Sequence, residues 1–98
     1  MMRQEGNRIL LDGPIVMDTV PTLLNQVALA RLGPEVEVDF SAATDLDSAA
    51  LALMLQWQRE SLQTHQKLRF TGVPANLNVL ISLYGLSVFL NPSPDLNV

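Results

Sequence analysis

The sequence predicts a single α/β domain: a small mixed sheet of four to five strands with helices mainly on one face. Residues 35–40 alternate strictly between carboxylates and apolar side chains, as in a strand with one buried and one wet face. Residues 67–71 repeat the alternation with basic residues on the wet face. If the two strands are neighbours, Glu35, Glu37 and Asp39 can face Lys67 and Arg69 across the sheet. A helix-length segment separates the two, so we expect a β-α-β unit whose strands are parallel.

The N-terminal third of the chain predicts a strand and a helix. Residues 8–12 form the strand, which Gly13-Pro14 closes, and residues 2–5 form a short edge strand before it. The helix is capped by Thr19 or Asp18, includes a proline in its first turn and ends near Gly33. Its apolar stripe consists of Leu23, Leu24, Val27, Ala28 and Leu32.

The helix from about Asp47 to Thr64 divides into two faces when residues are placed at 100° intervals. The expected core stripe is Leu51, Met54, Leu55, Gln58 and Leu62. The opposite face consists of Ala49, Ala52, Leu53, Gln56, Glu60 and Gln63, with Trp57 at its flank. Its first two turns are small or apolar, which a solvated helix rarely shows. The sequence therefore predicts partner contact here, unless loops or the C-terminal tail cover the face. A last helix opens at Val73-Pro74 and is capped by Gly85, with its stripe at Leu77, Leu80, Ile81 and Tyr84.

Residues 41–46 are expected to form a polar loop that delivers Asp47 and Ser48 to the start of the long helix. Backbone donors at a helix start favour phosphate and carboxylate groups, and small side chains there let another molecule approach. Asp45 and Asp47 are interpreted as helix-start residues rather than as catalytic acids, and Asp-x-Asp alone lacks the further ligands of a metal site. Ser48 is either a plain first-turn hydroxyl, an interface hydrogen-bonding group or a phosphoacceptor.

The composition disfavours several functional classes. Ten acidic residues against six scattered Lys and Arg give a net charge of −4, which argues against nucleic acid and anionic lipid. There is no Cys, and the sole His65 has no evident partner for acid–base work, so we expect neither an enzyme nor a metal or cofactor. The chain lacks a signal-peptide core and an apolar run of membrane-spanning length, so we expect a soluble, cytoplasmic protein.

The run Val38-Asp39-Phe40-Ser41, followed by Asp47-Ser48-Ala49-Ala50-Leu51-Ala52, resembles the motif of STAS domains. These are the modules of anti-sigma factor antagonists and sulfate-transporter tails. The resemblance covers nearly the whole chain and implies one domain of STAS (SpoIIAA-like) fold over residues 1–98, with a loose tail from about residue 91. Phosphoregulated members carry Asp-Ser-Ser-Gly-Leu-Gly, and a partner kinase phosphorylates the second Ser. Ala49 occupies that position here, which leaves Ser48 as the motif's only hydroxyl.

The chain is more similar to the MlaB-type STAS subunits of Mla phospholipid ABC transporters. Their motif is Asp-Thr-Gly-Gly-Leu-Ala, in which Thr takes the place of Ser48, while Ala49-Ala50 departs from the Gly-Gly pair. The run from Leu68 to Val73 and Leu83-Tyr84-Gly85-Leu86 are similar as well. The resemblance implies a bacterial, non-catalytic accessory subunit that supports an MlaF-like cytoplasmic ATPase. Such a subunit is peripheral to the inner membrane through its partner.

Two functions therefore compete. As a transporter accessory subunit, the chain would contact its ATPase through Thr44, Asp45, Asp47, Ser48, Ala49, Ala52, Leu53, Gln56 and Trp57. As an anti-sigma factor antagonist, it would bind an anti-sigma factor or serine kinase and would have to be phosphorylated on Ser48. The resemblance also leaves open a weak nucleotide site at the helix start, although no phosphate-loop motif supports one.

Overall fold

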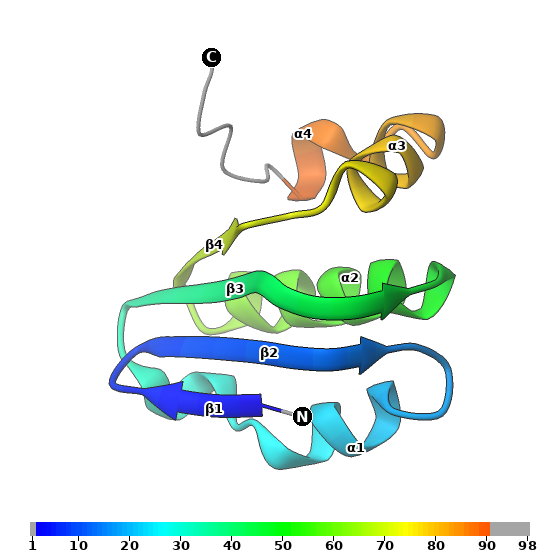
Figure 1. Cartoon of the computed structure of the whole chain (residues 1–98). Helices are drawn as coiled ribbons and strands as arrows, with labels where there is room; N and C mark the ends of the chain where they lie inside the picture. The colour runs from blue at the N-terminus through cyan, green and yellow to red at the C-terminus, as the bar shows by residue number, and fades with distance from the viewer. Residues whose placement is uncertain (1, 91–98) are drawn as a thin grey trace.

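The computed structural model describes residues 2–90 and contains a four-stranded mixed sheet of order β1-β2-β3-β4 (Figure 1). Strand β1 (Met2–Glu5) pairs antiparallel with β2 (Arg8–Ile15). Strands β3 (Glu35–Leu46) and β4 (Lys67–Thr71) continue the sheet in parallel. The edge strand, the β-α-β unit and the mixed α/β class are thus confirmed, while the tail expected from about residue 91 lies outside the described residues.

Two helices and a 3₁₀ turn lie behind the sheet in the view of Figure 1: α1 (Val20–Gln26), η1 (Leu29–Leu32) and α2 (Ser48–Gln63). Helices α3 (Ala75–Leu83) and α4 (Ser87–Leu90) lie beyond β4 and contact α2. The core fills the space between sheet and helices. Its largest fully buried side chains are Trp57, Phe40, Phe70, Ile9, Leu11, Ile15, Leu29, Leu53, Met54, Leu77, Ile81 and Leu90.

The first helix is shorter than expected, because it breaks at Val27 rather than continuing to Gly33. Val27 has extended dihedral angles (φ −114°, ψ 121°) and is itself buried. The break turns Leu29 into the core as part of η1 and leaves Ala28, expected in the apolar stripe, exposed. The side-chain amide of Gln66 donates to the carbonyls of Leu29 and Gly33, each at 2.7 Å, and holds the new turn in place.

Residues 41–46 form the second half of β3, so the expected polar loop is wrong. Strand β2 is also longer than expected, since it runs through Gly13 to Ile15. Between Leu10 and Asp12, and again between Gly13 and Ile15, β3 advances one residue more than β2. Such bulges bend a strand and interrupt its alternation, which explains why no strand pattern is visible in residues 41–46. The extension carries Asp47 to the far end of the sheet, where α2 begins.

Helix α2 has the expected length, but its buried arc differs from the predicted stripe. Leu51 and Met54 are in the core as expected, whereas Leu62 is 56% exposed. Leu53 and Trp57, predicted to face a partner, are completely buried. The reason is that α2 packs not only on the sheet but also against α1, η1, α3 and α4, so a wider arc of its surface is covered. Leu53 and Trp57 are therefore removed from the predicted contact surface.

Candidate functional site

The start of α2 is organised by Asp47, the residue that caps the helix. Its Oδ1 accepts from the Ala49 backbone N–H at 2.7 Å, and its main-chain carbonyl accepts from the Ala50 N–H at 3.0 Å. Its Oδ2 accepts from the Met17 N–H at 3.3 Å, which ties the β2–α1 connection to the helix. Asp47 is thus a structural cap, as the sequence predicted for a helix-start acid.

This arrangement argues against the weak nucleotide site that the resemblance left open at the helix start. The N–H groups of Ala49 and Ala50 both donate to Asp47, whose carboxylate occupies the place that an anion would take. Asp45 is exposed just before the helix and adds a second negative charge. A phosphate or nucleotide would meet repulsion here rather than free donors.

The outward face of α2 begins with small side chains. Ser48 is the first helical residue and is exposed, and so is Ala52 one turn later. Gln56 follows on the same face, half-buried, and its side-chain amide donates to Glu60 at 3.0 Å. Another protein could approach the backbone closely over Ser48 and Ala52, because both of these exposed side chains are short.

The structure places the nine predicted contact residues in three groups. Thr44, Asp45, Ser48 and Ala52 are exposed at one end of the molecule. Asp47, Ala49 and Gln56 are partly buried around them. Only the remaining two, Leu53 and Trp57, lie in the core and are unable to touch a partner.

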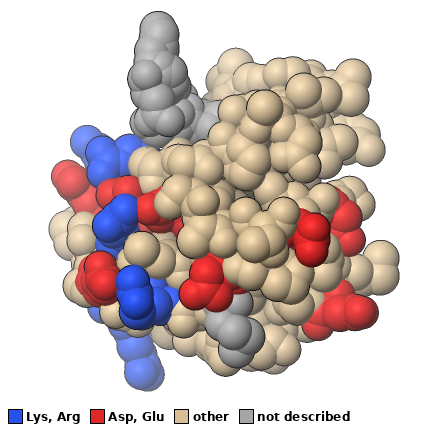
Figure 2. All heavy atoms as spheres, viewed as in Figure 1, with Lys and Arg blue, Asp and Glu red and all other residues tan. Residues whose placement is uncertain are grey.

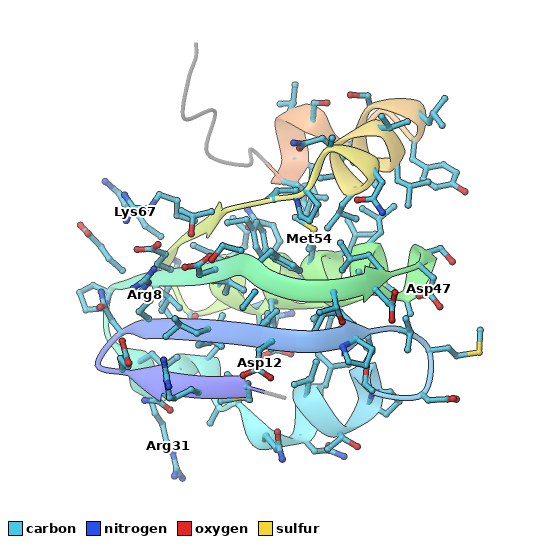
Figure 3. All side chains as sticks on the ribbon, viewed as in Figure 1. Arg8, Asp12, Arg31, Asp47, Met54 and Lys67 are labelled. Atoms are coloured by element: carbon cyan, nitrogen blue, oxygen red, sulfur yellow. The ribbon has the colours of Figure 1, made fainter. Side chains whose placement is uncertain are left out.

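Charge is distributed unevenly between the two ends of the sheet (Figure 2). All six Lys and Arg lie toward the end where the parallel strands begin or on elements that return to it: Arg3, Arg8, Arg31, Arg59, Lys67 and Arg69. The opposite end, here called the acidic end, carries Asp18, Asp45 and Asp47, whereas Asp12 lies midway along the sheet (Figure 3). Within residues 2–90, the six acids outside the acidic end equal the six cations in number, so the net negative charge of this part resides in the acidic end.

At the other end, here called the paired end, side chains form a network of hydrogen bonds and ion pairs on the sheet face opposite the helices. Its members are Arg8, Glu37, Asp39, Arg69 and Thr71. Glu37 accepts from Arg69 at 3.1 Å and from the Thr71 hydroxyl at 2.8 Å, and it forms an ion pair with Arg8 at 3.5 Å. Arg8 also donates to Asp39. The expected pairing of carboxylates with the basic face of β4 is confirmed for Glu37 and Arg69.

Asp39 departs from the exposed carboxylate that strand alternation predicts, since it is only 6% exposed. Burial raises the pKa of this carboxyl group. Hydrogen bonds from the Ser41 backbone N–H and hydroxyl, together with the hydrogen bond and charge of Arg8, outweigh that effect and lower the pKa below its ordinary value. Asp39 is therefore held ionised and belongs to the structural network.

A second surface feature was missed in the sequence. Large apolar side chains are exposed on α3 and α4, the most prominent being Leu83 at 73% and Val88 at 94%. Tyr84, expected in the core stripe of this helix, is also exposed, because α3 ends at Leu83 and the chain turns at Gly85 (φ +67°). The available signal was charge: no Asp, Glu, Lys or Arg occurs between Thr71 and Asp95.

Within residues 2–90, no group of three or more His, Cys, Asp or Glu side chains could hold a metal ion. Across this part of the chain, no helix combines the length and apolar character needed to cross a membrane. The exposed His65 lies just after α2, far along the helix from Ser48.

A small mixed sheet with helices on one face, a long helix capped directly after a strand, and a surface of small side chains define a compact α/β binding domain. The chain belongs to the STAS family: the family model described as "Mlab, STAS domain" matches residues 2–91. A search of curated proteins gave no match. STAS domains are generally non-catalytic binding modules, and membership supports an accessory or antagonist-like role.

Proposed function

We propose that this protein is a non-catalytic accessory subunit that binds and supports the cytoplasmic ATPase of an Mla-type phospholipid ABC transporter. The family match to an MlaB-type STAS domain supports this proposal. The observation that carries it is the exposed start of α2, where Ser48 presents a hydroxyl beside the small side chain of Ala52. The protein would be peripheral to the inner membrane through the ATPase.

The capping arrangement favours constant docking over a phosphate switch. Ala49 takes the place of the phosphoacceptor in regulated STAS domains, and its backbone N–H donates to Asp47. A phosphate on the neighbouring Ser48 would stand beside the carboxylates of Asp45 and Asp47 at the same helix start. The unmodified hydroxyl of Ser48 at the start of α2 suits a partner that donates a hydrogen bond to it or accepts one from it.

The second candidate is an anti-sigma factor antagonist, which the exposed hydroxyl of Ser48 keeps open. It requires phosphorylation of Ser48 by a serine kinase of the anti-sigma factor class. Intact-mass measurement and site mapping after incubation with such a kinase from the same organism decide the matter. A stoichiometric phosphate on Ser48 would favour this candidate over the transporter subunit.

The transporter proposal is tested with the purified ATPase subunit of the Mla-type transporter from the same organism. We expect the wild-type protein to bind it, and Ser48→Ala to weaken binding by about 0.5–2 kcal/mol through loss of an interface hydrogen bond. The stability of this variant should change little because the side chain is exposed. Thr22→Ala, a similar truncation at an exposed position of α1, is the matched control and should bind as wild type does. Equal affinity of all three proteins would refute the role of Ser48.

A further inference from the structure

The surface of α3 and α4 is apolar and uncharged over its whole described extent. The exposed side chains of Val79, Leu83, Tyr84, Val88 and Phe89 define what is here called the α3–α4 apolar face. The other large apolar side chains that are exposed in residues 2–90, Met17 and Leu62, lie on separate segments, and single exposed apolar residues are ordinary for a protein surface. Five such side chains on two short helices and the turn between them form a patch of the kind that marks an interaction surface.

The α3–α4 apolar face also includes a shallow depression. This open depression lies on the outer side of α3 and is lined by Asn78, Val79, Ser82 and Leu83. A depression with two amide or hydroxyl groups and two aliphatic side chains can receive an apolar side chain from another protein. The two polar groups at its wall can then bond to that protein's backbone.

The charge around this face indicates what kind of protein fits it. Helix α3 contacts α2 and lies above the second half of β3 in Figure 1, the half that leads to Asp45 and Asp47. Figure 2 shows the uncharged surface of α3 and α4 and acidic side chains at the same end of the molecule, with the basic side chains at the opposite end. A partner that covers α3 and reaches the start of α2 therefore meets apolar groups first and negative charge beside them.

We infer that the α3–α4 apolar face binds a protein surface made of apolar side chains flanked by Lys or Arg. The apolar side chains would fill the depression on α3, and the basic ones would lie against Asp45 and its neighbours at the acidic end. This inference rests on the proposed function and names the surface by which the ATPase would be recognised. It extends the contact from the start of α2 to a second, apolar area.

A second copy of this chain fits the face less well. A two-fold symmetric contact places the same patch against itself, and residues 72–90 offer such a copy no Lys or Arg. Each chain has a net charge of −4, and like charges across an interface oppose association. A basic partner gains from the same charges that would repel a copy.

The test measures affinity for the purified ATPase of the Mla-type transporter. Leu83→Glu and Val88→Glu place a charge on the apolar face and should weaken binding by about 10–30-fold. Leu62→Glu is the matched control, since Leu62 is an exposed leucine on α2, outside this face, and should bind within about twofold of wild type. Asp45→Lys should weaken binding about fivefold and reduce its salt dependence, whereas Glu5→Lys at the other end should do neither.

The outcomes separate the inference from the function on which it rests. Wild-type binding that Leu83→Glu leaves unchanged overturns the inference and leaves the transporter role standing. No binding of the wild-type protein overturns the role and this inference with it. Sedimentation velocity is run on the same folded proteins. A wild-type dimer that Leu83→Glu dissociates would assign the face to a second copy and overturn the basic-partner assignment. Stronger binding after truncation at Leu90 would assign it to residues 91–98 and overturn the inference too.

Discussion

The two ends of the sheet use charge in different ways. At the paired end, Glu37 and Asp39 are bonded by Arg8, Arg69 and a threonine hydroxyl. At the acidic end, Asp18 and Asp45 are exposed, with all six Lys and Arg toward the other end. The paired end uses its charges to hold strands in register, whereas the acidic end keeps negative charge available on its surface.

This difference indicates where to look for a binding surface in the part of the chain that the structure describes. Removing one partner of a charge pair that the fold has already neutralised destabilises the fold, and such paired charges are poor recognition groups. Charges left without compensation cost little when solvated and can steer a partner of opposite charge. Substitutions at the two ends should therefore separate stability from binding.

The largest effect on stability is expected for Gly72→Ala at the paired end. Gly72 has φ +62°, and an added Cβ would lie 2.8 Å from Asp39 Oδ1 and 2.9 Å from the Ser41 nitrogen. Left-handed strain and the collision together should cost about 2–4 kcal/mol in the free energy of unfolding, measured in urea. Gly6→Ala is the matched control: it has φ +61° but open space around it, so only the strain remains. Equal losses in the two variants would show that the close approach to Asp39 costs nothing.

The next effect is expected for Asp39→Asn, which keeps the shape of the side chain and removes its charge. The variant should lose about 1–3 kcal/mol at neutral pH, because Arg8 loses a charged acceptor in a nearly buried place. Since the folded pKa of Asp39 is lowered, its contribution is present above the unfolded pKa and is lost as pH falls through the folded pKa.

Urea unfolding of wild type and Asp39→Asn across acidic pH checks this sign. The difference between the two proteins should be constant near neutrality and shrink below about pH 4. Glu5→Gln is the control, because its ion pair with Arg3 joins two exposed side chains at 3.4 Å and should contribute under about 1 kcal/mol. A difference that grows on acidification would contradict the assignment of Asp39.

Much of the fold could be predicted because it depends on local patterns. The alternation of residues 35–40 and 67–71 predicted two strands, their parallel pairing and the contact of Glu37 with Arg69. Gly85 ended α3 as expected for a residue with positive φ. The second half of β3 was missed because bulges opposite β2 interrupt the alternation, and bulges depend on a neighbouring strand.

The candidate site was predicted only in part, for a related reason. Asp47 as the helix cap follows from its position in the sequence. The burial of Leu53 and Trp57 does not, because it depends on which elements cover the sides of α2. The exposure of Leu83 was missed for the opposite reason, since an apolar helix alone does not reveal that no other element covers it.

Asp45 and Asp47 allow the two roles of acidic side chains at this end, surface charge and helix cap, to be compared. Asp47→Ala should destabilise the protein by about 0.5–2 kcal/mol, because it removes the cap of α2 and the bond to Met17. Asp45→Ala, two residues earlier and exposed, should change stability by less than about 0.5 kcal/mol. Thermal unfolding of the two variants beside wild type gives the comparison. If Asp45→Ala proved as destabilising as Asp47→Ala, the view of Asp45 as a recognition group would be wrong.

The smallest expected effect is a gain, at His65 near the paired end. After α2 the Gln66 N–H donates to the Ser61 carbonyl at 2.8 Å, which completes a helix ending that requires a left-handed residue at position 65. His65 takes this conformation at φ +58°, where a side chain is strained and glycine is not. His65→Gly relieves the strain but loosens the unfolded chain, so the net gain should be about 0.5–1 kcal/mol in urea unfolding. Thr64→Gly, one residue earlier at φ −100°, has no such strain to relieve and should destabilise. A lower free energy of unfolding in both variants would mean that the exposed His65 side chain itself stabilises the end of α2. Stability near the paired end would then depend on more than its charged pairs.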